Sequence, residues 1–112
     1  MSIVPAHASE DLLHPFAHCA GRFSAEIQHA WLFEASDTAT LERQRAAFVS
    51  LIDSVASKDD LRNALNMRIS AKFAHAELLT QSSFSEDDTR RRTARERANW
   101  HLQQCTSLLL GG

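Results

Sequence analysis

Three basic side chains in the second half of the chain are spaced as on one face of a helix: Arg68, Lys72 and His75. Their spacing of four and then three residues places them inside an apolar stripe that contains Leu65 and Leu79. A cation buried on such a face without a partner costs several kcal/mol. The sequence therefore predicts a counter-ion or a ligand at this point.

Glu26 is the predicted counter-ion, because it falls at a similar height on the first helix, and Gln44 falls close to that level on the second. In one interpretation these residues form a small polar pocket, in which Arg68 and Lys72 receive a small anion while Glu26 and His75 move protons. In the other, Arg68 and Lys72 extend their charges along a helix edge and Glu26 forms an ordinary ion pair.

Residues with metal-binding side chains are present, but none completes a motif. Residues 26–29 read Glu-Ile-Gln-His, a single copy of a pattern that di-iron bundles use twice. A structural zinc site takes four ligands, and covalent haem needs a Cys-x-x-Cys-His motif that is absent. Two further sets are incomplete: the pair His14 and His18, and the trio Cys19, His101 and Cys105. We expect no metal and no cofactor.

Glycine is too scarce for the common catalytic and nucleotide-binding loops. The chain has only Gly21, Gly111 and Gly112, which excludes a Gly-x-Ser-x-Gly nucleophile elbow and a Gly-rich phosphate loop. An enzyme built on this chain would work from side chains alone. This favours a binding protein over a catalyst.

A run of arginines at 90–92, followed by Arg95 and Arg97, resembles a nucleic-acid patch. The acids at 86–88 each stand four residues before one of the first three arginines, the favourable order for ion pairs on a helix. The net charge of the chain is −2, which gives no attractive field for nucleic acid or anionic lipid. We predict a solvated, self-paired surface and no nucleic-acid partner.

The elements that position these side chains follow from a stretch of 89 residues, 22–110, without glycine or proline. Both residues disfavour helix interiors, and hairpin turns usually need glycine. Ser/Asp clusters divide the stretch, so the sequence predicts four helices at about 10–35, 38–56, 58–81 and 86–110. Short connections favour an all-α, up-down-up-down four-helix bundle. Two helical hairpins that dimerise into a larger bundle remain the alternative.

Helical periodicity assigns an inward stripe to each helix. The third and fourth helices are expected to begin with capping boxes, at Ser57 with Asp60 and at Ser85 with Asp88. The stripes contain, among others, Leu12, Phe16, Phe23, Ile27 and Trp31 on the first helix, Phe48 and Ile52 on the second, Leu61, Leu65, Ile69 and Leu79 on the third, and Ala94, Ala98, Cys105 and Leu108 on the fourth.

Cys19 and Cys105 fall on inward stripes of helices that meet in a bundle, within about one turn of each other. A disulfide between them is geometrically allowed, and two buried free thiols are the alternative. Residues 5–8 end in a small-x-small pattern like that of a signal-peptidase site, although the preceding residues are too few for an apolar h-region. Residues 1–8 are thus either a signal-peptide remnant, which implies the periplasm, or a flexible lead-in to a cytoplasmic protein.

Residues 9–112 form a single domain whose composition is that of a soluble protein, with no apolar run long enough to cross a membrane. Ten arginines against two lysines indicate a GC-rich, bacterial coding sequence. Trp100 points away from the apolar stripe of its helix, so it either contacts a protein partner or a second copy or lies flat across an adjacent helix. We favour a small interaction module. A ligand sensor or enzyme that uses Glu26, Arg68, Lys72 and His75 is the alternative.

Overall fold

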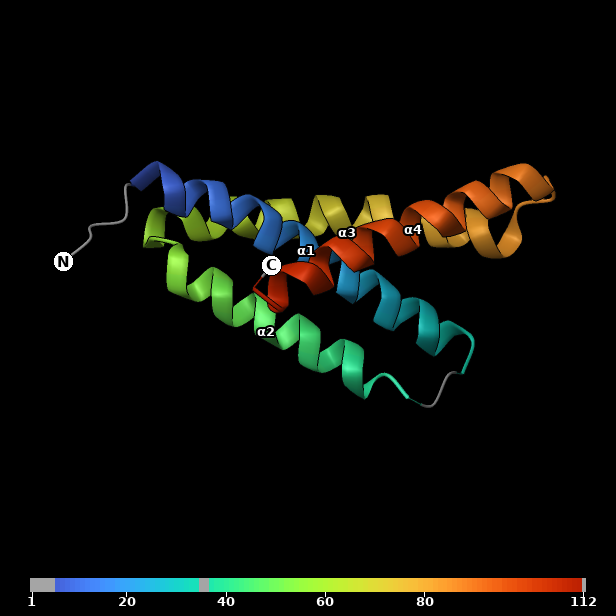
Figure 1. The fold of residues 1–112 in the computed structure, drawn as a ribbon, viewed down its shortest axis with the longest axis horizontal. Helices are drawn as coiled ribbons and strands as arrows, with labels where there is room; N and C mark the ends of the chain where they lie inside the picture. The colour runs from blue at the N-terminus through green and yellow to red at the C-terminus, as the bar shows by residue number, and fades with distance from the viewer. Residues whose placement is uncertain (1–5, 35–36, 112) are drawn as a thin grey trace.

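The computed structural model describes residues 6–34 and 37–111. Each of the four helices runs roughly opposite to the one before it (Figure 1). No strand occurs among the described residues. A short 3-10 turn, η1 (Lys58–Asp60), leads into the third helix. The four helices are α1 (Ala6–Leu32), α2 (Ala39–Val55), α3 (Leu61–Phe84) and α4 (Asp88–Leu109). The predicted all-α four-helix architecture is confirmed.

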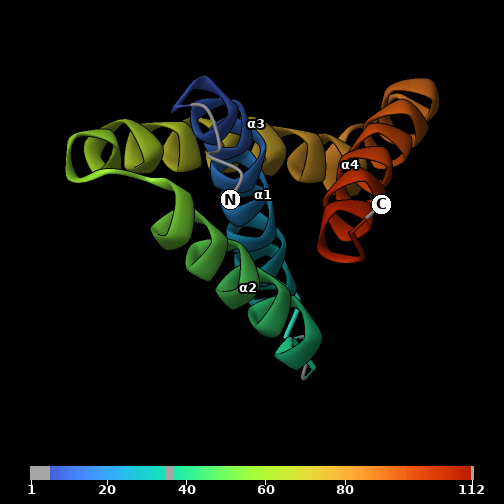
Figure 2. The same ribbon diagram turned by 60° about the vertical axis from the view of Figure 1, so that its left-hand side comes forward.

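Helix α1 is the central element, because its largest interfaces are with α3 and α2, whereas α4 packs mainly on α3. The assembly is elongated, with extents of 55 × 27 × 27 Å. Helices α2 and α3 diverge from their shared connection (Figure 2) and do not form an interface along their lengths. One long side of α3 therefore has no helix packed against it.

The larger core cluster is centred between α1 and α2, where the Phe23 and Phe48 rings stack with centroids 5.8 Å apart. A smaller cluster, Ala25, Leu79 and Ala98, joins α1 to α3 and α4. Helix α3 contributes smaller side chains to the interior, among them Ala64 and Ala71. The reason is the close approach of α3 to α1 at Gly21. A Cβ atom at that position would lie 2.2 Å from the Arg68 carbonyl oxygen, so only glycine fits this crossing.

The close crossing also explains why several predicted inward residues are exposed. Because α3 turns its small residues toward α1 at this crossing, Leu61, Leu65 and Ile69 face solvent, contrary to the predicted stripe, whereas Leu79 is buried as predicted. Leu12 and Trp31 of α1 and Leu108 of α4 were also predicted inward and are exposed.

Of the two predicted capping boxes, the one before the third helix is present and the one before the fourth is wrong. Ser57 and Asp60 form the expected capping box. At α4 the N-cap is Asp87, whose carboxylate accepts hydrogen bonds from the backbone N–H groups of Thr89 and Arg90 at 2.9 and 3.2 Å. Helix α3 continues to Phe84, beyond the predicted end, so Ser85 serves as its C-cap and cannot begin α4.

Cys19 and Cys105 lie at disulfide distance, with their Cα atoms 5.6 Å apart, so their predicted proximity is confirmed. The bond links α1 to α4 across 86 positions of sequence. Residues 6–8 already belong to α1, and the rest of the predicted lead-in, 1–5, lies outside the described residues. Among the helices described, none is both long and apolar enough to span a bilayer.

Candidate functional site

The first group of candidate residues is a hydrogen-bonded trio on one flank of α1. His75 of α3 is fully buried, and its Nε2 lies 2.7 Å from Glu26 Oε2. Its Nδ1 lies 3.0 Å from Nη1 of Arg22, one helical turn before Glu26. The structure thus joins Glu26 to His75, as their heights suggested, and adds Arg22, which the sequence analysis did not select. Its spacing of four from Glu26 was the available signal.

The partners of His75 define its tautomer. A guanidinium has only donors, so Arg22 donates and Nδ1 accepts. The ring proton is then on Nε2 and is donated to Glu26. Both ring nitrogens are occupied and the side chain has no exposed surface. The trio therefore satisfies a buried polar side chain, and no substrate can reach the imidazole in this arrangement.

The same flank continues as a seam of basic side chains between α1 and α4. His18 stacks on His14 at 4.1 Å, and His101 of α4 lies 6.4 Å from His75, ring to ring. Burial, together with the neighbouring charges, lowers the pKa of both His18 and His101. Burial also lowers the pKa of Arg22. This seam resists additional positive charge.

Arg68 and Lys72 are on the other flank of α1, separate from Glu26 and His75. With four neighbours they line a hollow of about 160 Å³, which we call the crossing pocket: Gly21, Ser24, Leu65, Arg68, Ile69 and Lys72. Gln44, half-buried on α2, is not among these residues. The five residues predicted to form one cluster are therefore separated: Glu26 and His75 belong to the closed trio, and Arg68 and Lys72 line the open crossing pocket. Ligand binding by these residues stays a prediction.

Arg45 of α2 adds a third cation to this side. Its Nη1 lies 3.5 Å from the Ser24 hydroxyl, which lines the crossing pocket. Among the described residues, a carboxylate lies against a basic side chain only where Glu26 accepts from neutral His75 and where Asp88 pairs with Arg91. Arg45, Arg68 and Lys72 thus have no acidic partner there. Sequence alone gave no signal for Arg45, because only tertiary packing brings α2 to Ser24.

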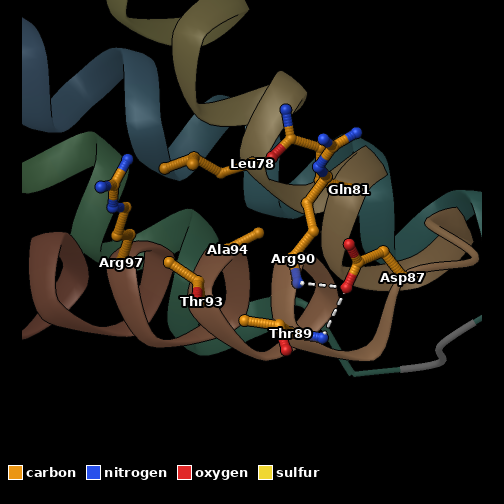
Figure 3. Close-up of a pocket in the computed structure, with 8 residues that line it drawn as sticks. All are labelled: Leu78, Gln81, Asp87, Thr89, Arg90, Thr93, Ala94 and Arg97. Atoms are coloured by element: carbon orange, nitrogen blue, oxygen red, sulfur yellow. Dashed lines mark hydrogen bonds between the residues drawn. The ribbon is translucent and has the colours of Figure 1, made fainter.

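A second hollow, of about 330 Å³, lies between α3 and the start of α4 (Figure 3). Arg90 and Arg97 border it, but both are exposed to solvent. The N–H groups that would attract an anion at this helix start are already bonded to Asp87, as the dashed lines show. The hollow is a surface recess whose helix-start N–H groups are already bonded to Asp87.

Trp100 points outward from α4, as predicted, with 57% of its surface exposed. Its ring packs edge-on against His101 at 5.1 Å and borders a shallow hollow of about 580 Å³. All residues that line this hollow come from α4, which gives it only one wall. Contact of Trp100 with another chain stays a prediction. In the part of the chain that the structure describes, no three His, Cys, Asp or Glu residues cluster as metal ligands.

An exposed row of apolar side chains on α3 was not selected from the sequence as a site. Four side chains spaced four residues apart form what we call the α3 ridge: Leu61, Leu65, Ile69 and Phe73. They are 47%, 51%, 43% and 69% exposed. Most other strongly exposed apolar residues, such as Leu32, Phe84 and Leu110, lie at helix ends. No family of known proteins, characterised protein or solved structure matches this chain.

Proposed function

We propose that this protein is an interaction module that binds an amphipathic helix of a partner protein along the α3 ridge. The exposure of four consecutive ridge residues carries the proposal. Rows of residues spaced by four form the ridges used in the commonest class of helix–helix packing. The ridge is about 18 Å long, which matches three turns of a docked helix.

Charge around the ridge identifies the kind of partner. Residues 61–73 carry Arg62, Arg68 and Lys72 and no acidic residue. A partner helix with an apolar face and acidic flanks complements this surface, and like charges on the partner would oppose binding.

The same charges argue against a second copy as the occupant. Antiparallel pairing of two ridges about their centre, residue 67, places Arg62 of one chain opposite Lys72 of the other. Parallel pairing places each cation beside the same residue of the second chain. Both arrangements bring like charges together at an interface that must exclude water.

A displayed library of amphipathic helices of about 20 residues tests the proposal, with a fixed apolar face and variable flanks. We expect selected helices to bind the wild-type protein and to lose at least about tenfold in affinity for Ile69→Ser and Phe73→Ser, which remove exposed anchors. Leu110→Ser is the matched control, because Leu110 is 81% exposed and lies off the ridge.

Two outcomes contradict the proposal. One is a library that yields no helix sensitive to the ridge variants. The other is a concentration-dependent dimer in sedimentation that Ile69→Ser abolishes, because the ridge would then be the contact between two copies. A dimer abolished instead by a change at Trp100 would place self-association on α4 and leave the ridge free.

The cysteine pair supports a location in an oxidising compartment such as the bacterial periplasm. Disulfides persist there and are rare in the cytosol. The alternative is a cytoplasmic protein with two buried thiols. Thiol titration of unfolded protein, isolated from cells under conditions that trap free thiols, distinguishes these locations: we expect no free thiol.

A further inference from the structure

The crossing pocket lies beside the α3 ridge and shares two residues with it, Leu65 and Ile69. Its floor is the place where α1 and α3 touch at Gly21, within reach of the Arg68 carbonyl and the Lys72 amide. Because the two backbones meet there, the side chains of Arg68 and Lys72 leave α3 at the edge of the contact. A helix that docks on the ridge passes over this pocket.

The polar lining of the pocket is complementary to an anion. Arg68 and Lys72 are half-buried, and half-buried Arg45 reaches Ser24 in the lining. None of these cations has an acidic partner among the residues described, whereas the cation of the neighbouring trio, Arg22, is bonded to His75. Partly desolvated cations form stronger ion pairs than those surrounded by water. The pocket therefore has unused capacity to bind a negative group.

The apolar lining restricts which anion fits. Leu65 and Ile69 form one wall, so the occupant carries its charge next to an apolar surface. An acidic side chain beside the apolar face of a docked helix has this chemistry. A volume of about 160 Å³ is large enough for one side-chain carboxylate but too small for the backbone of the docked helix to enter.

We propose that the crossing pocket binds the carboxylate of a glutamate or aspartate carried by the helix that docks on the α3 ridge. Arg68 and Lys72 supply the charge, Ser24 and Arg45 supply further donors, and Leu65 and Ile69 contact the adjoining apolar face. This inference rests on the proposed function and names the feature that the partner helix must contain.

The test compares one selected helix with its neutral counterpart. A fluorescent peptide with glutamate next to its apolar face is paired with a peptide that has glutamine at that position, and anisotropy gives both affinities. We expect the wild-type protein to prefer the glutamate peptide by about tenfold, because a charge-assisted hydrogen bond is lost with glutamine. In the Arg68→Met/Lys72→Met double variant the preference should fall below about threefold.

Arg62→Met is the matched control, because Arg62 is an exposed cation of the same helix outside the crossing pocket. It should keep the preference for glutamate. Circular dichroism melts of each variant establish that the fold is intact, and a variant that melts early is replaced by the single change Lys72→Gln.

The outcomes separate the two proposals. If both peptides bind the wild type equally, or the double variant keeps its preference, the carboxylate pocket is wrong and the ridge remains a helix-binding surface. If neither peptide responds to the ridge variants, the proposed function itself is wrong. An equal loss of preference in Arg62→Met would show a general electrostatic attraction and would also overturn the pocket.

Discussion

The two flanks of α1 differ in whether their charged side chains have hydrogen-bond partners. On one flank, Arg22 and Glu26 each bond to His75, and the imidazole is completely enclosed. On the other, Arg68 and Lys72 line a hollow without an acid. Both flanks use residues one helical turn apart on a single helix. Spacing alone therefore does not distinguish a structural polar cluster from a binding surface.

The difference arises from what packs against each flank. Helices α3 and α4 close the trio, and α4 is held to α1 by the Cys19–Cys105 pair. Helices α2 and α3 diverge from their connection (Figure 2), and only residues of α1 and α3 line the crossing pocket. Buried polar groups must be satisfied internally, whereas groups in an open pocket can be completed by water or a partner.

The largest expected effect is on the closed flank, from removal of the bond that holds α4. Replacing both Cys19 and Cys105 with alanine should lower the free energy of unfolding by about 4–5 kcal/mol on the chain-entropy model, because their separation is 86 residues. Urea unfolding of the oxidised protein measures this. Equal stability of the double variant and the wild type would mean that α4 is held by packing alone.

Gly21→Ala tests the crossing that separates the flanks. Helix propensity alone predicts a gain of about 1 kcal/mol. The added Cβ would lie 2.2 Å from the Arg68 carbonyl oxygen and 3.0 Å from the Lys72 amide nitrogen, so we expect instead a loss of about 3 kcal/mol. The sign of the change in urea unfolding decides between local propensity and the close crossing.

His75→Leu should destabilise the protein by about 2 kcal/mol, because it leaves Arg22 and Glu26 without their buried partner. Glu26 keeps access to water at 19% exposure, which limits the loss. His29→Leu is the control, since the His29 bond to Ser83 is exposed, and its effect should be under about 0.5 kcal/mol. Equal losses would contradict the contrast between closed and open polar groups.

The basic seam beside the trio predicts a pH dependence. Burial lowers the pKa of His18 and His101 below the ordinary value of 6.5, so the unfolded chain binds more protons than the folded one just below that pH. Stability should therefore be fully present above pH 6.5 and fall as the pH drops toward the lowered values. His18→Gln with His101→Gln should flatten the profile measured by urea unfolding between about pH 7 and pH 5.

The smallest stability effect is expected in the crossing pocket. Lys72→Met should leave the free energy of unfolding within about 0.5 kcal/mol or raise it, because it removes an unpaired cation and keeps the side-chain length. Arg22→Met, the matched change on the closed flank, should be clearly destabilising because it leaves His75 Nδ1 without a donor. Equal losses from both changes would show that Lys72 has a structural partner.

Much of the fold could be predicted because its signals are local. The absence of glycine and proline over residues 22–110 and the Ser/Asp clusters determine four helices and their approximate ends. Heights along an antiparallel bundle brought Cys19 near Cys105, and Glu26 near His75. Only a fixed rise per residue was needed for these predictions.

Only the tertiary structure decided which face of α3 is enclosed, whereas the predicted inward residues Phe23, Phe48 and Ala98 of the other helices are buried. Helical periodicity assigned Leu61, Leu65 and Ile69 to the core, but the close approach at Gly21 turns the small residues of α3 inward and leaves the ridge exposed. Arg68 and Lys72 lie on the open flank and His75 on the closed one, although the three share one face of α3. Periodicity specifies which residues share a face, whereas the distance and angle between packed helices determine which face is buried.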